Sequence, residues 1–200
     1  MSAFKIFALA SFFILEIVIA GKTVVLKKNN IKVSSSSKNA GFAKYFLFPV
    51  YLLVVLVFLL ELINPVFYTG LSFLPAKLST PLSASVLLQT TGVIFTTVSL
   101  ILLSKTLFDF KNSLRFGTYS NNLGELITTG IFSVSRNPFF ISIELYFIGI
   151  ALLLTTPFFI AIALLSIISI HFYILKEEKF LADNYGEAYK NYAKNVRRYF

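Results

Sequence analysis

Five long apolar segments restrict this chain to folds that can cross a membrane. Each is close to the ~20 residues that an α-helix needs to span a bilayer, and they occupy residues 3–20, 45–63, 82–104, 138–155 and 157–175. Of the 200 residues, 56% are hydrophobic and 14% are charged. A soluble domain of this size has too little interior to bury so much apolar surface. The sequence therefore predicts an all-α integral membrane protein with about five transmembrane helices.

The first apolar segment is interpreted as a retained helix rather than a cleaved signal peptide. Glu16 lies inside it, and Lys22, Lys27 and Lys28 follow it closely. This charge balance favours a helix that stays in the membrane with its N-terminus outside. The last two segments are joined by Thr155-Thr156-Pro157, which is short enough only for a tight hairpin.

The basic residues predict the orientation in the membrane. All except Lys5 and Lys77 fall within residues 22–44, 105–136 and 176–198, which share one side if there are five spans. By the positive-inside rule that side, including the C-terminus, is cytoplasmic. The membrane is then a plasma or inner membrane in a prokaryote and an endomembrane in a eukaryote. This topology and attraction to anionic headgroups explain the net charge of +9, so no nucleic-acid partner is expected.

The chain is expected to form a single membrane domain over residues 1–200. We interpret residues 1–81 as accessory N-terminal spans and loops, and residues 82–200 as the catalytic part. The Pro- and Gly-containing loop at 64–81 predicts an ordered external turn region, and Ser34 to Ser37 predict a flexible linker on the inner side. There is no Cys, and His171 is the single His. Thiolate and multi-histidine metal sites are therefore excluded, and no metal is predicted.

The first polar block that carries chemistry runs from Leu123 to Phe140. Thr128-Thr129-Gly130 interrupts regular structure, and Arg136-Asn137-Pro138 ends a loop and begins a helix, because proline suits the first helical turn. Free amide groups at a helix start bind anionic groups. An ordinary basic helix start at the membrane interface is the alternative interpretation.

The second polar block begins with Glu177-Glu178, directly after the last apolar segment. Two acids at the C-terminal end of a helix oppose its dipole, so we expect the helix to continue into the cytoplasm. Tyrosines then recur at helical intervals over residues 185–199, which predicts an amphipathic interfacial helix, either a lid over a pocket or a membrane anchor. For the two acids, a solvated pair bound to Lys176 and Lys179 is the alternative.

The order and spacing of these blocks resemble the integral-membrane methyltransferases of the isoprenylcysteine carboxyl methyltransferase family. That family is related in turn to the phospholipid N-methyltransferases. The resemblance covers residues 123–200, with a weaker echo at Ser113-Leu114-Arg115-Phe116-Gly117. It implies S-adenosyl-L-methionine (SAM) as cofactor and a lipophilic methyl acceptor.

The resemblance also implies roles for individual residues. The cofactor-binding positions are Gly124, Glu125, Leu126, Ile127, Phe132, Asn137, Pro138, Phe139, Phe140 and Glu178. The predicted catalytic residues are Glu177, Glu144 and Arg136, and the predicted substrate contacts are Tyr173 and Glu144.

Three positions depart from the family pattern. Many relatives have His where Asn137 stands and Tyr where Phe140 stands; Asn still donates and accepts hydrogen bonds. Relatives also commonly place Arg four residues before the first Glu, and Tyr173 occupies that position here. An anionic substrate would therefore lose the positive charge of that Arg, and His171 and Lys176 are candidates to replace it.

Glu144 lies within the fourth apolar segment, one turn after Phe140 on the same helix face. An ionisable group in hydrocarbon costs at least ~2.5 kcal/mol and usually faces a cavity or a partner. We expect Glu144 to line a lateral opening beside the last two segments. A carboxylate paired with another helix is the alternative.

The predicted function is SAM-dependent methyl transfer to a lipophilic or lipid-attached acceptor, a carboxylate or an amine, at the cytoplasmic membrane face. Such an enzyme mainly aligns the acceptor with the methyl group. An amine acceptor needs a base, for which Glu144 and Glu177 are candidates. The alternatives are a membrane NADPH-dependent sterol- or enone-type reductase, and a non-catalytic membrane protein that keeps the fold. Besides the substrate, membrane lipids are the expected partners, and the sequence fixes no oligomeric state.

Overall fold

The structure, a computed structural model, describes residues 3–30, 41–67, 72–83, 85–111, 113–114 and 124–200, with the backbone alone for residues 41–51. The predicted linker at Ser34 to Ser37, the Arg115 to Gly117 part of the weaker echo, and Leu123 lie outside these residues.

The described residues form helices and contain no β-strand. In chain order the elements are α1 (Ala3–Lys28), α2 (Gly41–Phe67), α3 (Ala76–Ser79), α4 (Val86–Asp109), the 3-10 helix η1 (Gly130–Ser133), α5 (Pro138–Leu154), α6 (Pro157–Tyr185) and α7 (Glu187–Asn195). By length and composition α1, α4 and α6 are able to cross a membrane, and the apolar helix α5 is shorter. The prediction of an all-α membrane protein is confirmed.

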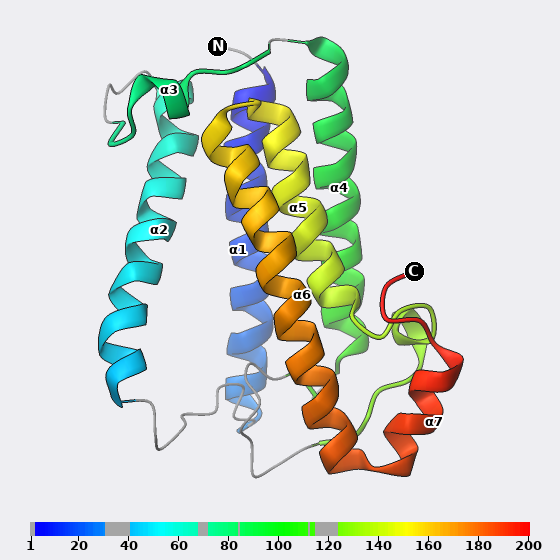
Figure 1. The fold of residues 1–200 in the computed structure, drawn as a ribbon. Coiled ribbons are helices and arrows are strands. Elements are labelled where there is room, and N and C mark those ends of the chain that lie inside the picture. The colour runs from blue at the N-terminus through cyan, green and yellow to red at the C-terminus, as the bar shows by residue number, and fades with distance from the viewer. Residues whose placement is uncertain (1–2, 31–40, 68–71, 84, 112, 115–123) are drawn as a thin grey trace.

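The long helices alternate in direction, so that the N-terminus and α7 lie at opposite ends of the molecule (Figure 1). α6 continues beyond its apolar part, which ends at Leu175, and runs to Tyr185. The prediction that this helix extends past Glu177-Glu178 is thus confirmed. Residues from Lys176 onward form a polar extension outside the membrane-spanning part of α6.

α4 and α5 pack closely because glycines lie where the two helices meet. A Cβ atom added to Gly92 would lie 2.7 Å from the backbone nitrogen of Leu153, and one added to Gly149 would collide with Thr96. Ser99 donates a hydrogen bond of 2.7 Å from its Oγ to the backbone carbonyl of Ser142. Small residues of this kind let membrane helices approach until backbone and side chains touch.

Aromatic side chains join α2 to this bundle. The ring of Phe58 on α2 lies 5.9 Å from Phe12 on α1, 5.8 Å from Phe147 on α5 and 5.2 Å from Phe159 on α6. Two of these pairs are edge-to-face, at 87° and 83°, a favourable aromatic geometry. A single residue thus anchors α2 against three helices.

The α5–α6 hairpin is the tight turn that the sequence predicts. Thr155 adopts a left-handed conformation with φ of 51°, and Thr156 caps α6 by accepting a hydrogen bond from the backbone N–H of Phe159. Pro157 occupies the first turn of α6, where its missing N–H costs nothing. This turn holds α5 and α6 side by side, so their other ends meet at the opposite end of the bundle.

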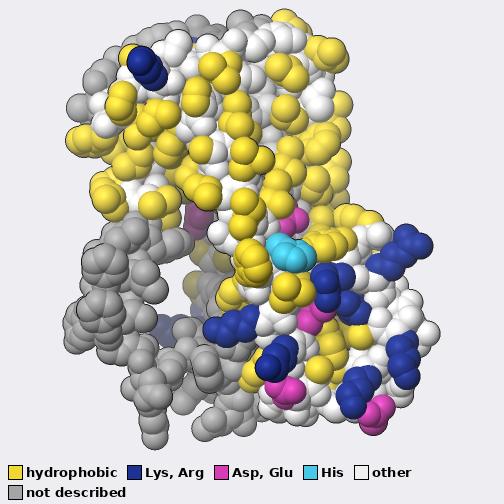
Figure 2. All heavy atoms as spheres, in the orientation of Figure 1, with side chains coloured by type: hydrophobic (Ala, Val, Ile, Leu, Met, Phe, Trp, Pro, Cys, Tyr) yellow, Lys and Arg dark blue, Asp and Glu magenta, His cyan; other side chains and the backbone are white. Residues whose placement is uncertain are grey.

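Charge and apolar surface are separated along the bundle. Figure 2 shows hydrophobic side chains over the end that carries the hairpin, and Lys and Arg gathered at the end that carries α7. Leu164 and Ile168 on α6 are 58% and 55% exposed, as expected of side chains that face lipid. The polar end therefore carries the side chains that are least compatible with hydrocarbon.

Candidate functional site

The end of α4 positions the first polar block. The Asp109 carboxylate accepts a 2.8 Å hydrogen bond from the backbone N–H of Ile131, in η1. Gly130 precedes it with φ of +65°, and a Cβ atom there would collide with the Asp109 carboxylate. Glycine is therefore required at 130 both for its backbone conformation and for space. This contact fixes the turn that leads to Arg136 and Asn137.

Glu178 is the centre of a buried polar cluster at the start of α5. Arg136 donates to both of its carboxylate oxygens, from Nε at 3.1 Å and from Nη2 at 3.2 Å. Asn137 donates from Nδ2 at 3.0 Å, and Arg198 donates from Nε at 3.0 Å. Burial of a carboxylate is tolerated when its oxygens are satisfied in this way. The predicted catalytic Arg136 is thus bound to the protein's own carboxylate.

The segment after α7 folds back onto this block. Arg136 donates a backbone hydrogen bond of 3.0 Å to the carbonyl of Arg197, and Asn137 Nδ2 also donates to the carbonyl of Arg198 at 3.2 Å. The hydroxyl of Tyr192 donates to the carbonyl of Phe132 at 2.6 Å. Residues 187–198 are therefore held against residues 132–137 at several points.

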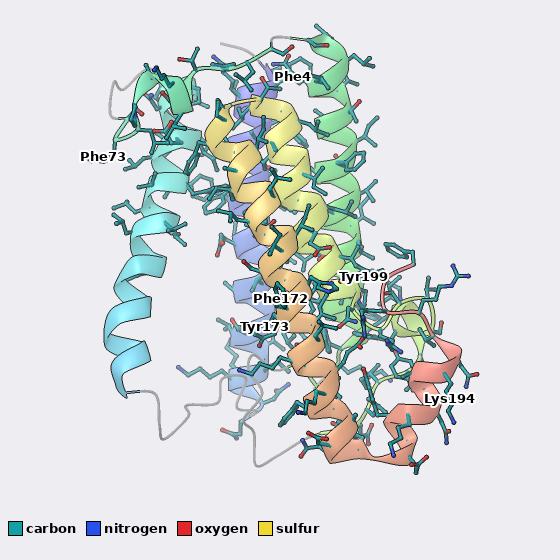
Figure 3. All side chains as sticks on the ribbon, viewed as in Figure 1. Phe4, Phe73, Phe172, Tyr173, Lys194 and Tyr199 are labelled. Atoms are coloured by element: carbon teal, nitrogen blue, oxygen red, sulfur yellow. The ribbon has the colours of Figure 1, made fainter. Side chains whose placement is uncertain are left out.

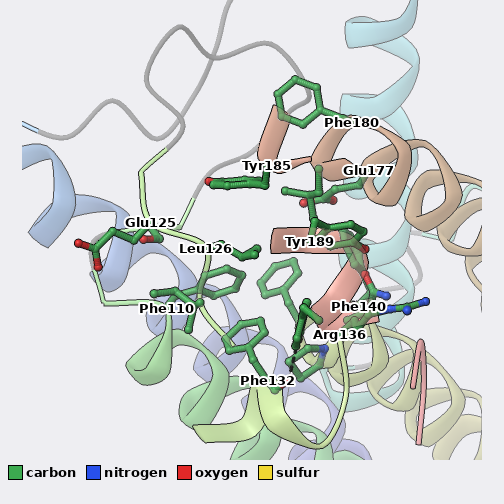
Figure 4. A pocket seen from close by; sticks show the side chains of 17 residues that line it. Phe110, Glu125, Leu126, Phe132, Arg136, Phe140, Glu177, Phe180, Tyr185 and Tyr189 are labelled. Atoms are coloured by element: carbon green, nitrogen blue, oxygen red, sulfur yellow. Dashed lines mark hydrogen bonds between the residues drawn. The ribbon is translucent and has the colours of Figure 1, made fainter. Parts of the chain in front are cut away.

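A pocket lies between α7, the end of α6 and the first polar block. Its lining includes the following residues predicted from the sequence: Glu125, Leu126, Ile127, Phe132, Arg136, Asn137, Pro138, Phe139, Phe140 and Glu177. The pocket is open to solvent. Figure 4 shows Glu125 and Arg136 on opposite sides of this pocket.

Two predicted residues lie beside the pocket rather than in its lining. Glu178 contacts the lining residues Arg136 and Asn137. Gly124 accepts a hydrogen bond of 3.1 Å at its carbonyl from the hydroxyl of Tyr185, which does line the pocket. The two sequence blocks thus converge on one site.

Several lining residues were not among the predicted site residues: Phe110, Ser113, Phe180, Leu181, Tyr185, Tyr189 and Tyr192. The three tyrosines, which the sequence predicts to belong to a lid or an anchor, line the pocket. Phe110 packs edge-to-face on Phe132 at 4.7 Å. Phe110 directly follows Asp109, the last residue of α4, and no signal in the sequence indicated its place in the site.

Glu177 differs from its neighbour because it faces the pocket. Burial, and secondarily the charge of Glu178, raise the pKa of Glu177 to about 7. Among the described residues no salt bridge to Glu177 is formed, in contrast to Glu178. Glu177 is therefore able to bind and release a proton near neutral pH.

An apolar pocket adjoins the first. The two share Phe110, Phe139, Phe140 and Glu177, and the apolar pocket adds Leu114, Ser169, Ile170 and Tyr173. The ring of Tyr173 lies 5.3 Å from that of Phe140. Glu177 thus lies where the pocket at the polar end of the bundle meets an apolar pocket that follows α6 toward the membrane.

Glu144 lies elsewhere. It lines a separate pocket with Ile167, Ile168, His171, Phe172 and Tyr199. The Nδ1 atom of His171 is 2.7 Å from the Tyr199 hydroxyl; Figure 3 shows Tyr199 beside α6, while Lys194 on α7 points away from the bundle. The structure does not bring Glu144 into the pocket of Glu177, nor into that of Tyr173.

Comparison with known proteins assigns a family to much of the chain. The sequence model of the phospholipid methyltransferase family matches residues 83–188, which is more than half of the chain. No curated protein gives a significant match. The family is one of membrane methyltransferases, which confirms the prediction of a membrane enzyme of this class and disfavours the reductase and the non-catalytic protein.

Proposed function

Since this chain belongs to the phospholipid methyltransferase family, we propose that it transfers the methyl group of SAM to a lipophilic amine at the cytoplasmic face of a membrane. The observation that carries the proposal is the position of Glu177, which lines both the pocket at the polar end and the apolar pocket beside α6. A polar methyl donor and a lipid acceptor need such a junction.

The pocket at the polar end suits SAM by the chemistry of its lining. SAM combines a flat adenine base, a ribose, a carboxylate and a sulfonium cation. Phe110, Phe132 and Leu126 offer apolar faces for the base. The carboxylate is suited by the N-terminus of α5, where Asn137 makes no capping hydrogen bond with its side chain. Residues 124–127, 132 and 137–140 would therefore hold the cofactor, with Glu178 supporting them.

The acceptor is an amine because of the charges around the junction. Bound SAM supplies a methyl group on a positively charged sulfur, ready for in-line displacement. Glu177, with its pKa near 7, attracts an ammonium group and takes its proton, which frees the nitrogen lone pair. Tyr173 supplies no positive charge where a carboxylate substrate would need one.

The base is assigned to Glu177 rather than to Glu144, because Glu144 lines a different pocket. A substrate contact by Glu144 stays a prediction. Arg136 is assigned a positioning role, because its guanidinium is bound by Glu178 and by the carbonyl of Ala193 at 2.7 Å. It would hold the start of α5 against α6 and so set the shape of the pocket.

Residues 82–200 form the catalytic part in this proposal, and residues 1–81 are accessory. The lining of both pockets comes from Phe110 onward, and the family match begins at residue 83. SAM would enter from the cytoplasm at the polar end. The lipid would reach Glu177 sideways along the apolar pocket of Tyr173, whose side chain is partly exposed on α6.

The proposal is tested with the purified protein in lipid nanodiscs. We expect calorimetric binding of S-adenosylhomocysteine, and transfer of radiolabelled methyl from SAM to phosphatidylethanolamine but not to a prenylcysteine carboxylate. Glu177→Gln should lower transfer at least tenfold while SAM affinity changes less than about threefold; Asp183→Asn, an exposed acid on the same helix, is the matched control. Methylation of the carboxylate alone would refute the amine, and absence of binding would refute the cofactor.

A further inference from the structure

The hydroxyl of Tyr189 is buried without a hydrogen-bond partner. Among the described residues only two side-chain polar atoms have this property, this hydroxyl and Oγ1 of Thr96. Thr96 lies in the α4–α5 contact, whereas Tyr189 lines the pocket at the polar end. Tyr189 is 4% exposed. A buried polar group of this kind costs free energy unless something else satisfies it.

The neighbouring tyrosines make the contrast sharper. Tyr192, one turn further on α7, donates its hydroxyl to the carbonyl of Phe132 at 2.6 Å. Tyr185, at the end of α6, donates to the carbonyl of Gly124 at 3.1 Å. Both hydroxyls therefore serve the fold by holding α6 and α7 against the first polar block. Tyr189, which lies between them in the chain, makes no such hydrogen bond.

The surroundings of Tyr189 indicate which kind of ligand group it meets. Its ring lies edge-on to Tyr192, with centroids 6.0 Å apart, and Phe110 and Phe132 form a second aromatic pair in the same lining. Aromatic faces favour a flat ring, and a hydroxyl among them reads the polar edge of that ring or of a sugar joined to it.

We propose that Tyr189 donates a hydrogen bond to the nucleoside half of the bound methyl donor, an inference that rests on the function proposed above. Burial and the negative charge of Glu178 raise the pKa of Tyr189 above its ordinary value, so the hydroxyl keeps its proton and remains a donor at neutral pH. Tyr189 is on this view a ligand contact supplied by α7, not part of a membrane anchor.

The test uses two variants that each remove one hydroxyl, Tyr189→Phe and Tyr192→Phe, in nanodiscs. The probes are S-adenosylhomocysteine and methylthioadenosine, which lacks the amino-acid group. We expect Tyr189→Phe to weaken binding of both probes by the same factor, roughly three- to tenfold. The ligand-free protein should be as stable as the wild type or more stable, because an unsatisfied group is gone. Tyr192→Phe should instead lower the stability of the ligand-free protein, because the carbonyl of Phe132 loses its donor.

Three results would overturn the inference. Unchanged affinity in Tyr189→Phe would show that the hydroxyl meets no ligand. A loss of ligand-free stability as large as that in Tyr192→Phe would show that it has a structural partner. Weaker binding of S-adenosylhomocysteine without weaker binding of methylthioadenosine would place the contact on the amino-acid half. Wild-type protein that binds neither probe would overturn the proposed function itself.

Discussion

Replacing Glu178 with Gln should remove the charge that holds the polar end together. The side chains of Arg136 and Glu178 are only 11% and 10% exposed, so the variant leaves the Arg136 guanidinium buried without its counter-charge. Breaking a buried ion pair on one side costs about 3–5 kcal/mol. Arg198 is 37% exposed and adds about 0–1 kcal/mol, as surface pairs do. The expected loss in free energy of unfolding is therefore about 3–6 kcal/mol.

The measurement is reversible unfolding in mixed micelles followed by circular dichroism, together with limited trypsin digestion of the folded protein. Trypsin should cleave after Lys194 faster in the variant, because Arg198 and Asn137 no longer share a carboxylate that binds the segment down. Glu187→Gln is the matched control: it removes the 2.7 Å pair with Lys190, whose partners are 74% and 58% exposed. It should cost less than about 1 kcal/mol. Equal losses in the two variants would refute the claim that Glu178 holds this end of the fold.

Three further predictions follow from the packing, the charges and the orientation. Methyl transfer should rise as pH increases through about 7, because the raised pKa of Glu177 means that its basic form appears there, and Glu177→Gln should lose this rise; an identical pH profile in both proteins would contradict the base assignment. Stability should change with pH in the opposite direction, because the folded state binds the Glu177 proton more tightly than the unfolded state does. The contribution of this proton to the free energy of unfolding is complete below about pH 4.5 and is lost as pH rises through about 7. Gly149→Ala should lower the free energy of unfolding by about 1–3 kcal/mol because its new methyl group has no room beside Thr96, whereas Gly21→Ala, which meets nothing within 4 Å, should have no cost in the same unfolding experiment. A tag after Phe200 should be accessible only from the cytoplasm in intact cells, and labelling from outside would reverse the proposed orientation.

Hydropathy was sufficient to predict the membrane helices but not all of their ends. The apolar run ends at Leu175 because its length matches the hydrocarbon layer. The helix α6 itself ends later, where Gly186 adopts φ of 55°, a conformation that glycine tolerates. The extension of α6 was predictable only from the acids at 177 and 178, which would be unfavourable at a helix end.

The site was predictable in part. The family resemblance brought Glu125 to Ile127 and Glu177 into one set, and the structure places them in one pocket. The resemblance implied a catalytic role for Glu177 and a cofactor contact for Glu178, and only Glu177 lies in the lining of that pocket. Adjacent residues on a helix point about 100° apart, so one acid faces the pocket while the other faces Arg136. Which of them does so depends on how α6 is rotated against α5, and that rotation is set by packing.

The inward turn of the segment after α7 was the largest feature beyond the reach of the sequence. The spacing of Tyr189 and Tyr192 fits an interfacial helix as well as a pocket wall, since periodicity defines a face and not what covers it. From the sequence alone, Arg198 is predicted to be one more basic residue at the membrane surface. Its bond to Glu178 appears only when residues 20 positions apart are brought together.

The attachment of α7 through Glu178 and Tyr192 has a consequence for affinity. α7 forms one wall of the pocket, so a ligand that needs this wall binds only those molecules in which the segment is docked. The apparent Kd is then the intrinsic Kd divided by the docked fraction. If about half of the molecules were undocked, affinity would fall twofold with no ligand contact altered. Reciprocally, a filled pocket would hold α7 in place, so the rate of trypsin cleavage after Lys194 would report occupancy of a site that trypsin never touches.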